Sequence, residues 1–430
     1  MSKLKKDTST IFKGFSKISY EQRLKSLIDV QLLSAEDANY LRSGGLKDTT
    51  LAEKFVENVI GYFQLPLGVA INFNIDGKDF VIPMAVEETS IVAAASKTAK
   101  WIRENGSIKT EILGTEIIGQ IQFAKVKDFA NFKKQIELQK NYLIELANRE
   151  VAFGLVNRGG GIRNITVRKL VREDGLDMGV VHIYMDPCDA MGANVMNQVC
   201  EFLKEPLESF TSETVNMCIL SNLVDSKLTR ATIEMKMDAD LALKIEEASR
   251  FAELDPYRAA TNNKGVLNGI DPVLIATGND WRAVEAGVHA YATTSGQYRS
   301  ITKWRKTSDG VIGTLTAPLV VGTVGGVTTL HPTAKIGMKI LDIKSAAELS
   351  RVVAAVGLTQ NLGALRALTT VGIIEGHMKL HIKNLSLGAG ATEFEMPTVV
   401  KKLEEILALR KRISLSNAVE VLKDLRKSGH

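Results

Sequence analysis

The chain has 430 residues, 45% of them apolar and 24% charged, which is typical of a globular protein with two or three domains. Its net charge of +5 is spread along the chain, and aromatic residues do not alternate with the basic clusters, so no nucleic-acid partner is expected. Three irregularly spaced cysteines and the lack of any run of 18 apolar residues predict a cytoplasmic protein without disulfides, secretion signal or membrane span.

Helical periodicity covers residues 16–63, after which the pattern changes. Alternating segments on either side of Asp76-Gly77 predict a β-hairpin, and a run of small residues from Ala93 onward predicts a helix. Glu88 is therefore expected at the junction between a strand and a helix.

A second pair of alternating segments, 164–171 and 179–185, is joined by a polar turn and predicts antiparallel strands. A parallel Rossmann unit would need a helix between them. A helix is expected from about Asp189 to Leu207, and residues 227–236 could add a strand to the same small sheet.

From residue 239 onward the pattern is mostly helical, with a long helix expected over 346–368 and a glycine-rich bend over 321–328. The last fifty residues predict two amphipathic helices, 398–412 and 416–426. Asn417 and Glu420 have the spacing of a capping pair at the start of the second helix.

Lys264 lies between Asn263 and Gly265, and Asp280 follows sixteen residues later. A lysine beside an amide and a glycine can aim its ammonium group at a developing oxyanion. Each of the two residues could equally be an ordinary polar residue of a turn. Glu88 could exchange a proton if burial raised its pKa, and if all three share a site, their protons belong to the cluster.

The sequence DAMGAN begins at Asp189, which could cap the predicted helix, while Gly192 leaves its first turn without a Cβ. The free N–H groups of a helix N-terminus suit the pyrophosphate of a dinucleotide. Many helices begin in this way without binding a ligand. The glycines 159–161 between Arg158 and Arg163 add a flexible turn with two cations.

His377 and His381 are four residues apart, a spacing that would place both on one helical face, as in some zinc sites. Met378 stands where metalloproteases have glutamate, and no third ligand is near, so no metal is expected. A histidine here could instead act as a general acid on a moving lid.

In combination, the motifs resemble class II 3-hydroxy-3-methylglutaryl-CoA reductase, the soluble bacterial and archaeal form, along nearly the whole chain. In the family's order they are ENVIG (57–61) with LPLG (65–68), ETSIVA (88–93), DAMGAN (189–194), RAATNNKG (258–265), GND (278–280), GTVGG (322–326) and GHM (376–378).

The resemblance implies an α+β fold with three parts. These are a helix-rich large substrate-binding domain over 1–112 and 222–376, an inserted small dinucleotide-binding domain over 113–221, and a C-terminal helical flap over 377–430. The small domain is expected to have an antiparallel, ferredoxin-like sheet and no Rossmann unit. A homodimer with its active site at the subunit interface is implied, and higher oligomers are left open.

The implied reaction is the four-electron reduction of (S)-HMG-CoA to (R)-mevalonate and coenzyme A by two NAD(P)H, a step of the mevalonate pathway to isoprenoids. By resemblance, Lys264 stabilises the oxyanion at both hydride transfers and Glu88 supplies a proton to the aldehyde oxygen. Asp280 bridges the two and tunes their protonation. His377 protonates the departing coenzyme A thiolate.

The resemblance also implies the binding residues. Ser90 and Arg258 hold the free carboxylate of the substrate, Asn268 supports the lysine, and Glu57 and Asn58 lie on the coenzyme A side. The dinucleotide side comprises Asp189, Ala190, Met191, Gly192, Asn194, Arg158, Gly322, Gly325 and Gly326. NADPH is favoured because of Arg158 and Arg163, with NADH as the alternative cofactor.

Four positions depart from the common class II pattern: Thr89, Asn262, Val327 and Glu375, where proline, histidine, a small residue and glutamine are common. None is a catalytic group. Three other functions stay open, namely an NAD-dependent enzyme that oxidises mevalonate, an inactive coenzyme A-binding relative, and a Schiff-base lyase that uses Lys264.

Overall fold

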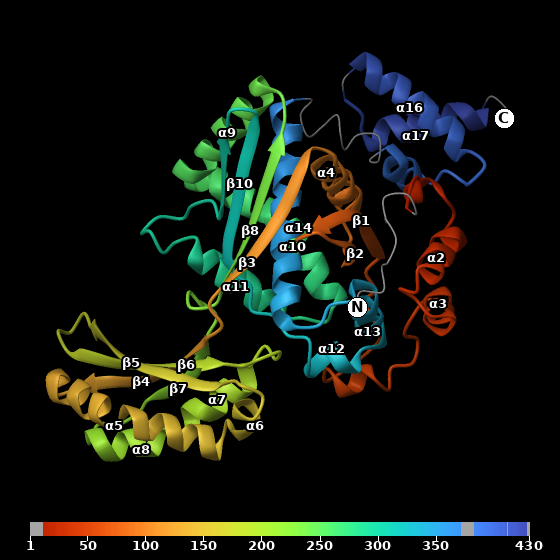
Figure 1. The fold of residues 1–430 in the computed structure, drawn as a ribbon. Helices are drawn as coiled ribbons and strands as arrows, with labels where there is room; N and C mark the ends of the chain where they lie inside the picture. Colours follow the sequence, from red (N-terminus) through yellow and green to blue (C-terminus); the bar gives the residue numbers. More distant parts are fainter. Residues whose placement is uncertain (1–11, 371–381, 411, 428–430) are drawn as a thin grey trace.

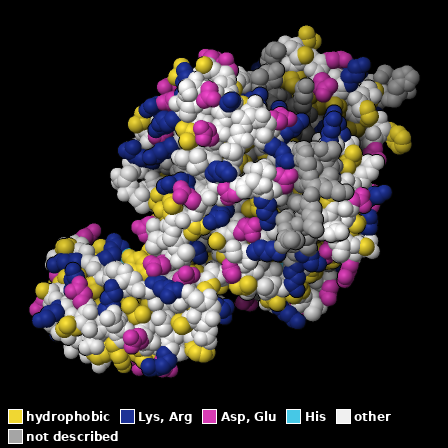
Figure 2. Space-filling model, in the orientation of Figure 1, with side chains coloured by type: hydrophobic (Ala, Val, Ile, Leu, Met, Phe, Trp, Pro, Cys, Tyr) yellow, Lys and Arg dark blue, Asp and Glu magenta, His cyan; other side chains and the backbone are white. Residues whose placement is uncertain are grey.

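The computed structural model describes residues 12–370, 382–410 and 412–427. It contains a six-stranded sheet with the order β2-β1-β3-β8-β10-β9 and a four-stranded sheet with the order β5-β6-β4-β7. Figure 1 shows the two sheets in separate parts of the molecule, with the four-stranded sheet at the lower left. Positive and negative side chains are interspersed over the face shown in Figure 2.

From residue 12 onward, the helical segments before the first sheet are η1 (Phe15–Lys17), α2 (Tyr20–Asp29), α3 (Ala35–Arg42) and η2 (Ala52–Lys54). Ser19 and Ser34 cap α2 and α3 in capping boxes. The helix predicted as far as residue 63 is wrong beyond η2, because residues 55–66 have no helix or strand and Asn58 adopts a left-handed conformation.

The larger sheet contains β1 (Leu67–Ile75), β2 (Lys78–Ala85), β3 (Gly106–Leu113), β8 (Leu228–Lys236), β9 (Thr302–Lys306) and β10 (Gly310–Pro318). β1 and β2 form the predicted hairpin around Asp76-Gly77. β8 pairs with β3 and β10, so the placement of residues 227–236 in the small sheet was wrong. Alternation shows which side chains are buried, but both sheets offer a core that could bury them.

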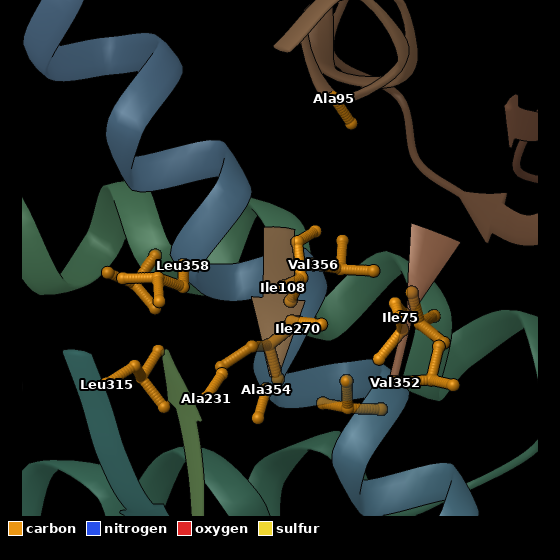
Figure 3. Close-up of a cluster of buried hydrophobic side chains, with 14 of the residues drawn as sticks. Ile75, Ala95, Ile108, Ala231, Ile270, Leu315, Val352, Ala354, Val356 and Leu358 are labelled. Atoms are coloured by element: carbon orange, nitrogen blue, oxygen red, sulfur yellow. The ribbon is translucent and has the colours of Figure 1, made fainter. Parts of the chain in front are cut away.

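The helices of this part are α4 (Ile91–Asn105), α9 (Ala239–Leu254), α10 (Pro256–Ala276), α11 (Trp281–Tyr291), α12 (Gly326–Leu330), α13 (Pro332–Leu341) and α14 (Ala346–Thr369). Helix α14 is apolar on nearly all sides and runs through the core. Figure 3 shows its residues Val352, Ala354, Val356 and Leu358 among side chains of β1, β3, β8, β10 and α10.

The smaller sheet contains β4 (Ile117–Val126), β5 (Gly161–Val171), β6 (Asp177–Asp186) and β7 (Met217–Ser221), and every pairing in it is antiparallel. Helices α5 (Phe129–Glu150), α6 (Phe153–Val156), α7 (Ala193–Phe202) and α8 (Lys204–Thr211) lie along one side of this sheet in Figure 1. The part has a hydrophobic core of its own. The α+β fold and the antiparallel small sheet are therefore confirmed.

The two predicted C-terminal helices are present as α16 (Met396–Arg410) and α17 (Leu415–Lys427), and they share a small apolar cluster with Ile382 and Leu385. The predicted capping pair was misplaced. Helix α17 starts at Leu415, so Asn417 is its third residue and not its cap. The backbone N–H and the hydroxyl of Ser414, which precedes the helix, both donate to Asn417 Oδ1. In the described part of the chain, no helix combines the length and apolar character that crossing a bilayer requires.

Candidate active site

Lys264 and Glu88 meet at the surface of the larger part, with Lys264 Nζ 3.3 Å from Glu88 Oε2. Glu88 lies between β2 and α4, at the predicted junction of strand and helix. The side chains are 63% and 44% exposed, and an ion pair this accessible contributes at most about 1 kcal/mol to stability. Both charged groups therefore remain open to a ligand.

Lys264 lies in the middle of α10, so the alternative of a turn residue is wrong. A Cβ added at the neighbouring Gly265 would meet no atom of the described residues within 4 Å. A glycine inside a helix costs about 1 kcal/mol relative to alanine, and packing within this chain does not require one here. The open space beside Gly265 agrees with the expectation that a ligand or second subunit comes close to the backbone.

Asp280 is the N-cap of α11, where its Oδ1 accepts the backbone N–H groups of Arg282 and Ala283. It also pairs with the Arg282 guanidinium at 3.3 Å. Among the described residues, no hydrogen bond or ion pair joins Asp280 to Lys264 or Glu88. A single chain thus brings two of the three predicted groups together, and the convergence of all three stays a prediction.

Arg258 and Ser90 both carry polar groups for which the described residues provide no partner. The Arg258 guanidinium is half-buried, and burial lowers its pKa. Ser90 has a left-handed backbone with φ of 78°, and its hydroxyl is buried without a hydrogen bond. An unpaired buried hydroxyl costs about 1–3 kcal/mol and a strained backbone a similar amount, and such features concentrate at binding sites.

Asn268 and Asp271 follow Lys264 by four and seven residues, so the three lie along one face of α10. Asp271 was not among the predicted residues. Burial and the neighbouring Glu285 raise the pKa of Asp271 to about 8, and its Oδ1 is buried without a donor. The Asp271 carboxyl group therefore holds a proton near neutral pH, a property that the local sequence GID (269–271) did not predict.

The two predicted dinucleotide segments are in contact. The backbone N–H of Thr323 donates to the Asp189 carbonyl at 2.9 Å. A Cβ at Gly322 would lie 2.7 Å from the Met191 nitrogen, so only glycine allows this approach. The N–H of Gly322 donates to Asn279 Oδ1 at 2.8 Å, which ties the bend to the GND motif.

The predicted capping role of Asp189 at its own helix was wrong. Helix α7 starts at Ala193 after Gly192, whose φ is 91°, and no side chain caps it. The Asp189 carboxylate instead accepts the backbone N–H of Ala346 at the start of α14, at 2.9 Å. Before α7 the chain turns at Cys188, whose backbone is left-handed. The N–H groups at the start of α7 are thus left without a side-chain acceptor.

The remaining cofactor residues lie in accessible loops or at the first residues of helices. Arg158 is exposed, and its carbonyl accepts the Cys188 thiol at 3.7 Å, which places the glycine turn 159–161 next to Asp189. Asn194, Ala190 and Met191 are at least partly exposed. Gly325 is the exposed N-cap of α12, and the exposed Gly326 is the first residue of that helix.

A cavity of about 1190 Å³ lies along the loop that holds ENVIG and LPLG. It is lined by Tyr62, Phe63 and Gly68 of this loop and by basic residues of α4, including Lys97 and Lys100, and it extends to Gly278 and Val327. Glu57 and Asn58 are exposed and do not line it. The loop, but not these two side chains, borders a space large enough for an extended ligand.

His377 lies outside the described residues, and so do Glu375 and His381. Within the described ranges, no three histidine, cysteine or acidic side chains are grouped as metal ligands would be. The cysteines at 188, 200 and 218 are free thiols.

Comparison with known proteins agrees with this arrangement. The family model of hydroxymethylglutaryl-coenzyme A reductase matches residues 19–382. The 3-hydroxy-3-methylglutaryl-coenzyme A reductase of Archaeoglobus fulgidus is 44% identical over 429 residues, which are 99% of this chain and 97% of that protein. A probable enzyme of the same name from Borreliella burgdorferi is 33% identical, with 98% and 96% covered.

Solved structures give the same result. The reductase of Streptococcus pneumoniae superposes with a TM-score of 0.81 at 38% identity, with 96% of this chain and 99% of that chain covered. The class II enzyme of the same organism bound to NADPH in open conformations also gives 0.81 at 38% identity, with 84% and 100% covered. The fold and these comparisons define a class II reductase. The chain belongs to the hydroxymethylglutaryl-CoA reductase family.

Proposed function

We propose that this protein reduces (S)-HMG-CoA to (R)-mevalonate and coenzyme A with two molecules of NADPH. The observation that carries the proposal is the contact between Lys264 and Glu88, which places an ammonium group and a carboxyl group together and open to a ligand. Family membership supports the thioester as the substrate of this pair.

The chemistry assigned to the pair follows from the two charges. Each bound nicotinamide supplies one hydride to the carbonyl carbon. Lys264 stabilises the negative charge that then develops on the oxygen, which is worth about 3–4 kcal/mol of barrier for one preorganised donor. Glu88 supplies the proton that the second reduction requires at the aldehyde oxygen. Between the reductions the C–S bond breaks, and His377 protonates the coenzyme A thiolate.

The substrate and the coenzyme have proposed places. Ser90 and Arg258 hold the free carboxylate, which agrees with the unpaired polar groups of both residues. Asn268 orients Lys264 from the next turn of α10. The chain of coenzyme A lies in the cavity beside the ENVIG loop, and the basic side chains of α4 face its phosphates.

The dinucleotide is proposed to lie where DAMGAN meets the glycine-rich bend, with its phosphates at the uncapped start of α7. NADPH is preferred to NADH because Arg158 and Arg163 flank the adjacent glycine turn, and a class II relative is described with NADPH bound. Initial rates with the two cofactors test this choice. No metal takes part, and a chelator is expected to leave the rate unchanged.

We also propose the domain division named above, with a small domain over 113–221 and a flap over 377–430. The separate hydrophobic cores of the two sheets and of α16 and α17 support it. A homodimer would complete the site, because Asp280 makes no contact with the catalytic pair in one chain. A cytoplasmic location agrees with three free thiols.

The decisive experiment follows reduced nicotinamide by absorbance with HMG-CoA and purified protein. Two NADPH oxidised for each mevalonate formed is the expected stoichiometry. Folded protein that consumes no NADPH with the thioester, yet binds coenzyme A, would instead be an inactive relative. Faster turnover with mevalonate, coenzyme A and NAD would reverse the proposed direction.

A further inference from the structure

The two residues before Lys264 are buried asparagines that anchor the middle of α10. Asn262 is 3% exposed and Asn263 is 0% exposed. The Asn262 amide donates to Ser300 Oγ at 2.7 Å and Thr302 Oγ1 at 3.1 Å. Its oxygen accepts from Asn361 Nδ2 at 2.8 Å, so this one side chain links α10 to β9 and α14.

Asn263 holds the same turn of α10 by hydrogen bonds to the segment 298–301. Its amide donates to the Arg299 carbonyl at 2.9 Å and to the Tyr298 hydroxyl at 3.1 Å, and its oxygen accepts from the N–H of Ile301 at 3.1 Å. The Tyr298 oxygen lies 2.7 Å from Nδ1 of His289 on α11. Since Tyr298 accepts from Asn263, it can donate its own proton to this nitrogen of a neutral imidazole.

Tyr298 therefore joins the helix that carries Lys264 to the helix that Asp280 caps. Asn263 precedes Lys264 on α10, and His289 lies in the last turn of α11, whose N-cap is Asp280. No described contact runs directly between Lys264 and Asp280. The Tyr298 hydroxyl instead links their helices through two hydrogen bonds, one to Asn263 on α10 and one to His289 on α11.

This buried hydrogen-bond network fixes the position of α10 more precisely than the stability of the fold requires. Buried amide and hydroxyl groups gain little net stability even when all their hydrogen bonds form, whereas apolar side chains could fill the same space. A satisfied polar network does fix one geometry, because any shift leaves a buried donor or acceptor without a partner. Asn262 in place of the family's common histidine supplies two donors and an acceptor and cannot change its charge with pH.

We propose that Tyr298 is a positioning residue for the reduction, and that its hydroxyl holds the Lys264 turn of α10 in a fixed place relative to α11. The proposal rests on the function proposed above. Tyr298 touches no reacting group in this scheme and acts through Asn263 and His289.

The test compares Tyr298→Phe with Tyr40→Phe in the full-length protein. Tyr40 is a matched control, because its hydroxyl makes one side-chain hydrogen bond, to Thr333 Oγ1 at 3.0 Å, outside the network. A small displacement of a catalytic group can cost up to about 100-fold in rate, so we expect kcat to fall about 10-fold or more in Tyr298→Phe with KM values within about twofold. Tyr40→Phe should keep the kcat of the wild type even if its melting temperature falls.

His289→Phe separates the two arms of the link, because it keeps an aromatic ring beside Tyr298 and removes the nitrogen that bonds its hydroxyl. Its kcat should fall less than that of Tyr298→Phe, since the bond to Asn263 remains. A wild-type kcat in His289→Phe would overturn the link to α11, and a wild-type kcat in Tyr298→Phe would overturn the whole proposal.

Hydrogen exchange provides a readout that does not depend on activity. Amides of residues 258–270 should exchange faster in Tyr298→Phe than in the wild type or in Tyr40→Phe. If the wild type does not reduce HMG-CoA, the proposed function fails, while this exchange difference still decides whether Tyr298 holds the turn. Equal exchange in the two tyrosine variants would contradict the proposal.

Discussion

At the scale of single residues, the strongest expectation concerns the Lys264 ammonium. Lys264→Ala should lower kcat by about 10²–10³-fold, the loss of roughly 3–4 kcal/mol for one preorganised oxyanion donor. The folded state should lose almost nothing, because the pair with Glu88 is exposed. Kinetics and thermal unfolding measure the two effects. Lys133→Ala is a suitable control, because Lys133 pairs with Glu137 on α5 at a similar exposure.

A retained fold with full activity in Lys264→Ala would remove this residue from the mechanism.

The lysine and Glu88 could be found from the sequence because motif order identified the family and the strand-to-helix junction was visible. The role of Asp189 could not be predicted from the sequence, since its partner, the N–H of Ala346, lies 157 residues away. Local capping rules describe only the few residues that follow a candidate cap.

Asp271 allows a prediction about pH. Burial and Glu285 raise its pKa to about 8, whereas the unfolded chain has an ordinary value near 4. Between these values the folded state binds the extra proton, so this group makes the free energy of unfolding decrease from pH 4 to pH 8 and level off above. Asp271→Asn cannot ionise and should be more stable than the wild type at pH 8, by about 1–3 kcal/mol, with a smaller difference at pH 5.

Denaturant unfolding at several pH values measures this difference. Glu285→Gln should also flatten the pH dependence, because it removes one of the two charges that repel each other. Parallel stability curves for the wild type and Asp271→Asn would show that Asp271 holds no extra proton in the folded state.

At the scale of elements, two glycines of α10 should respond to alanine in opposite ways. Gly265 faces open space, so Gly265→Ala should stabilise one chain by about 1 kcal/mol through helix propensity. A Cβ at Gly269 would lie 2.9 Å from Val356 O and Gln360 Cβ, so Gly269→Ala should destabilise by about 1–3 kcal/mol as α10 and α14 are pushed apart.

Enzyme kinetics of Gly265→Ala show whether position 265 is a glycine because a ligand or a second subunit binds there. If substrate or a second subunit approaches the backbone there, Gly265→Ala should raise KM for HMG-CoA while the melting temperature rises. An unchanged KM would show that the glycine has no binding role.

Sequence patterns identified α14 within one residue of its observed end, because its apolar run is long. They misplaced β8, since a strand pattern does not show which sheet the strand joins.

At the scale of the whole molecule, one chain leaves the proposed site incomplete and large apolar side chains exposed beside it. Ile60 is fully exposed, at 103%, in the loop that also borders the cavity, and Val56 and Phe63 of the same loop are exposed as well. Several exposed apolar side chains in one segment are typical of an interaction surface. The sequence could suggest a homodimer only through family resemblance, because a self-complementary surface depends on where distant loops lie in the fold.

Ile60→Asp should therefore weaken the proposed homodimer, because each subunit would lose about 1.5–3 kcal/mol of apolar burial and would place a charge in the interface. Light scattering should find the wild type near twice the chain mass of 46.9 kDa and the variant closer to one chain, with kcat reduced in parallel. Leu138→Asp is the matched control, since this residue is exposed on α5, far from the proposed site in sequence, and should leave mass and rate unchanged. A fully active monomer of Ile60→Asp would show that Asp280 reaches the catalytic pair by a movement within one chain, such as closure around the bound substrates, and that no second subunit is needed.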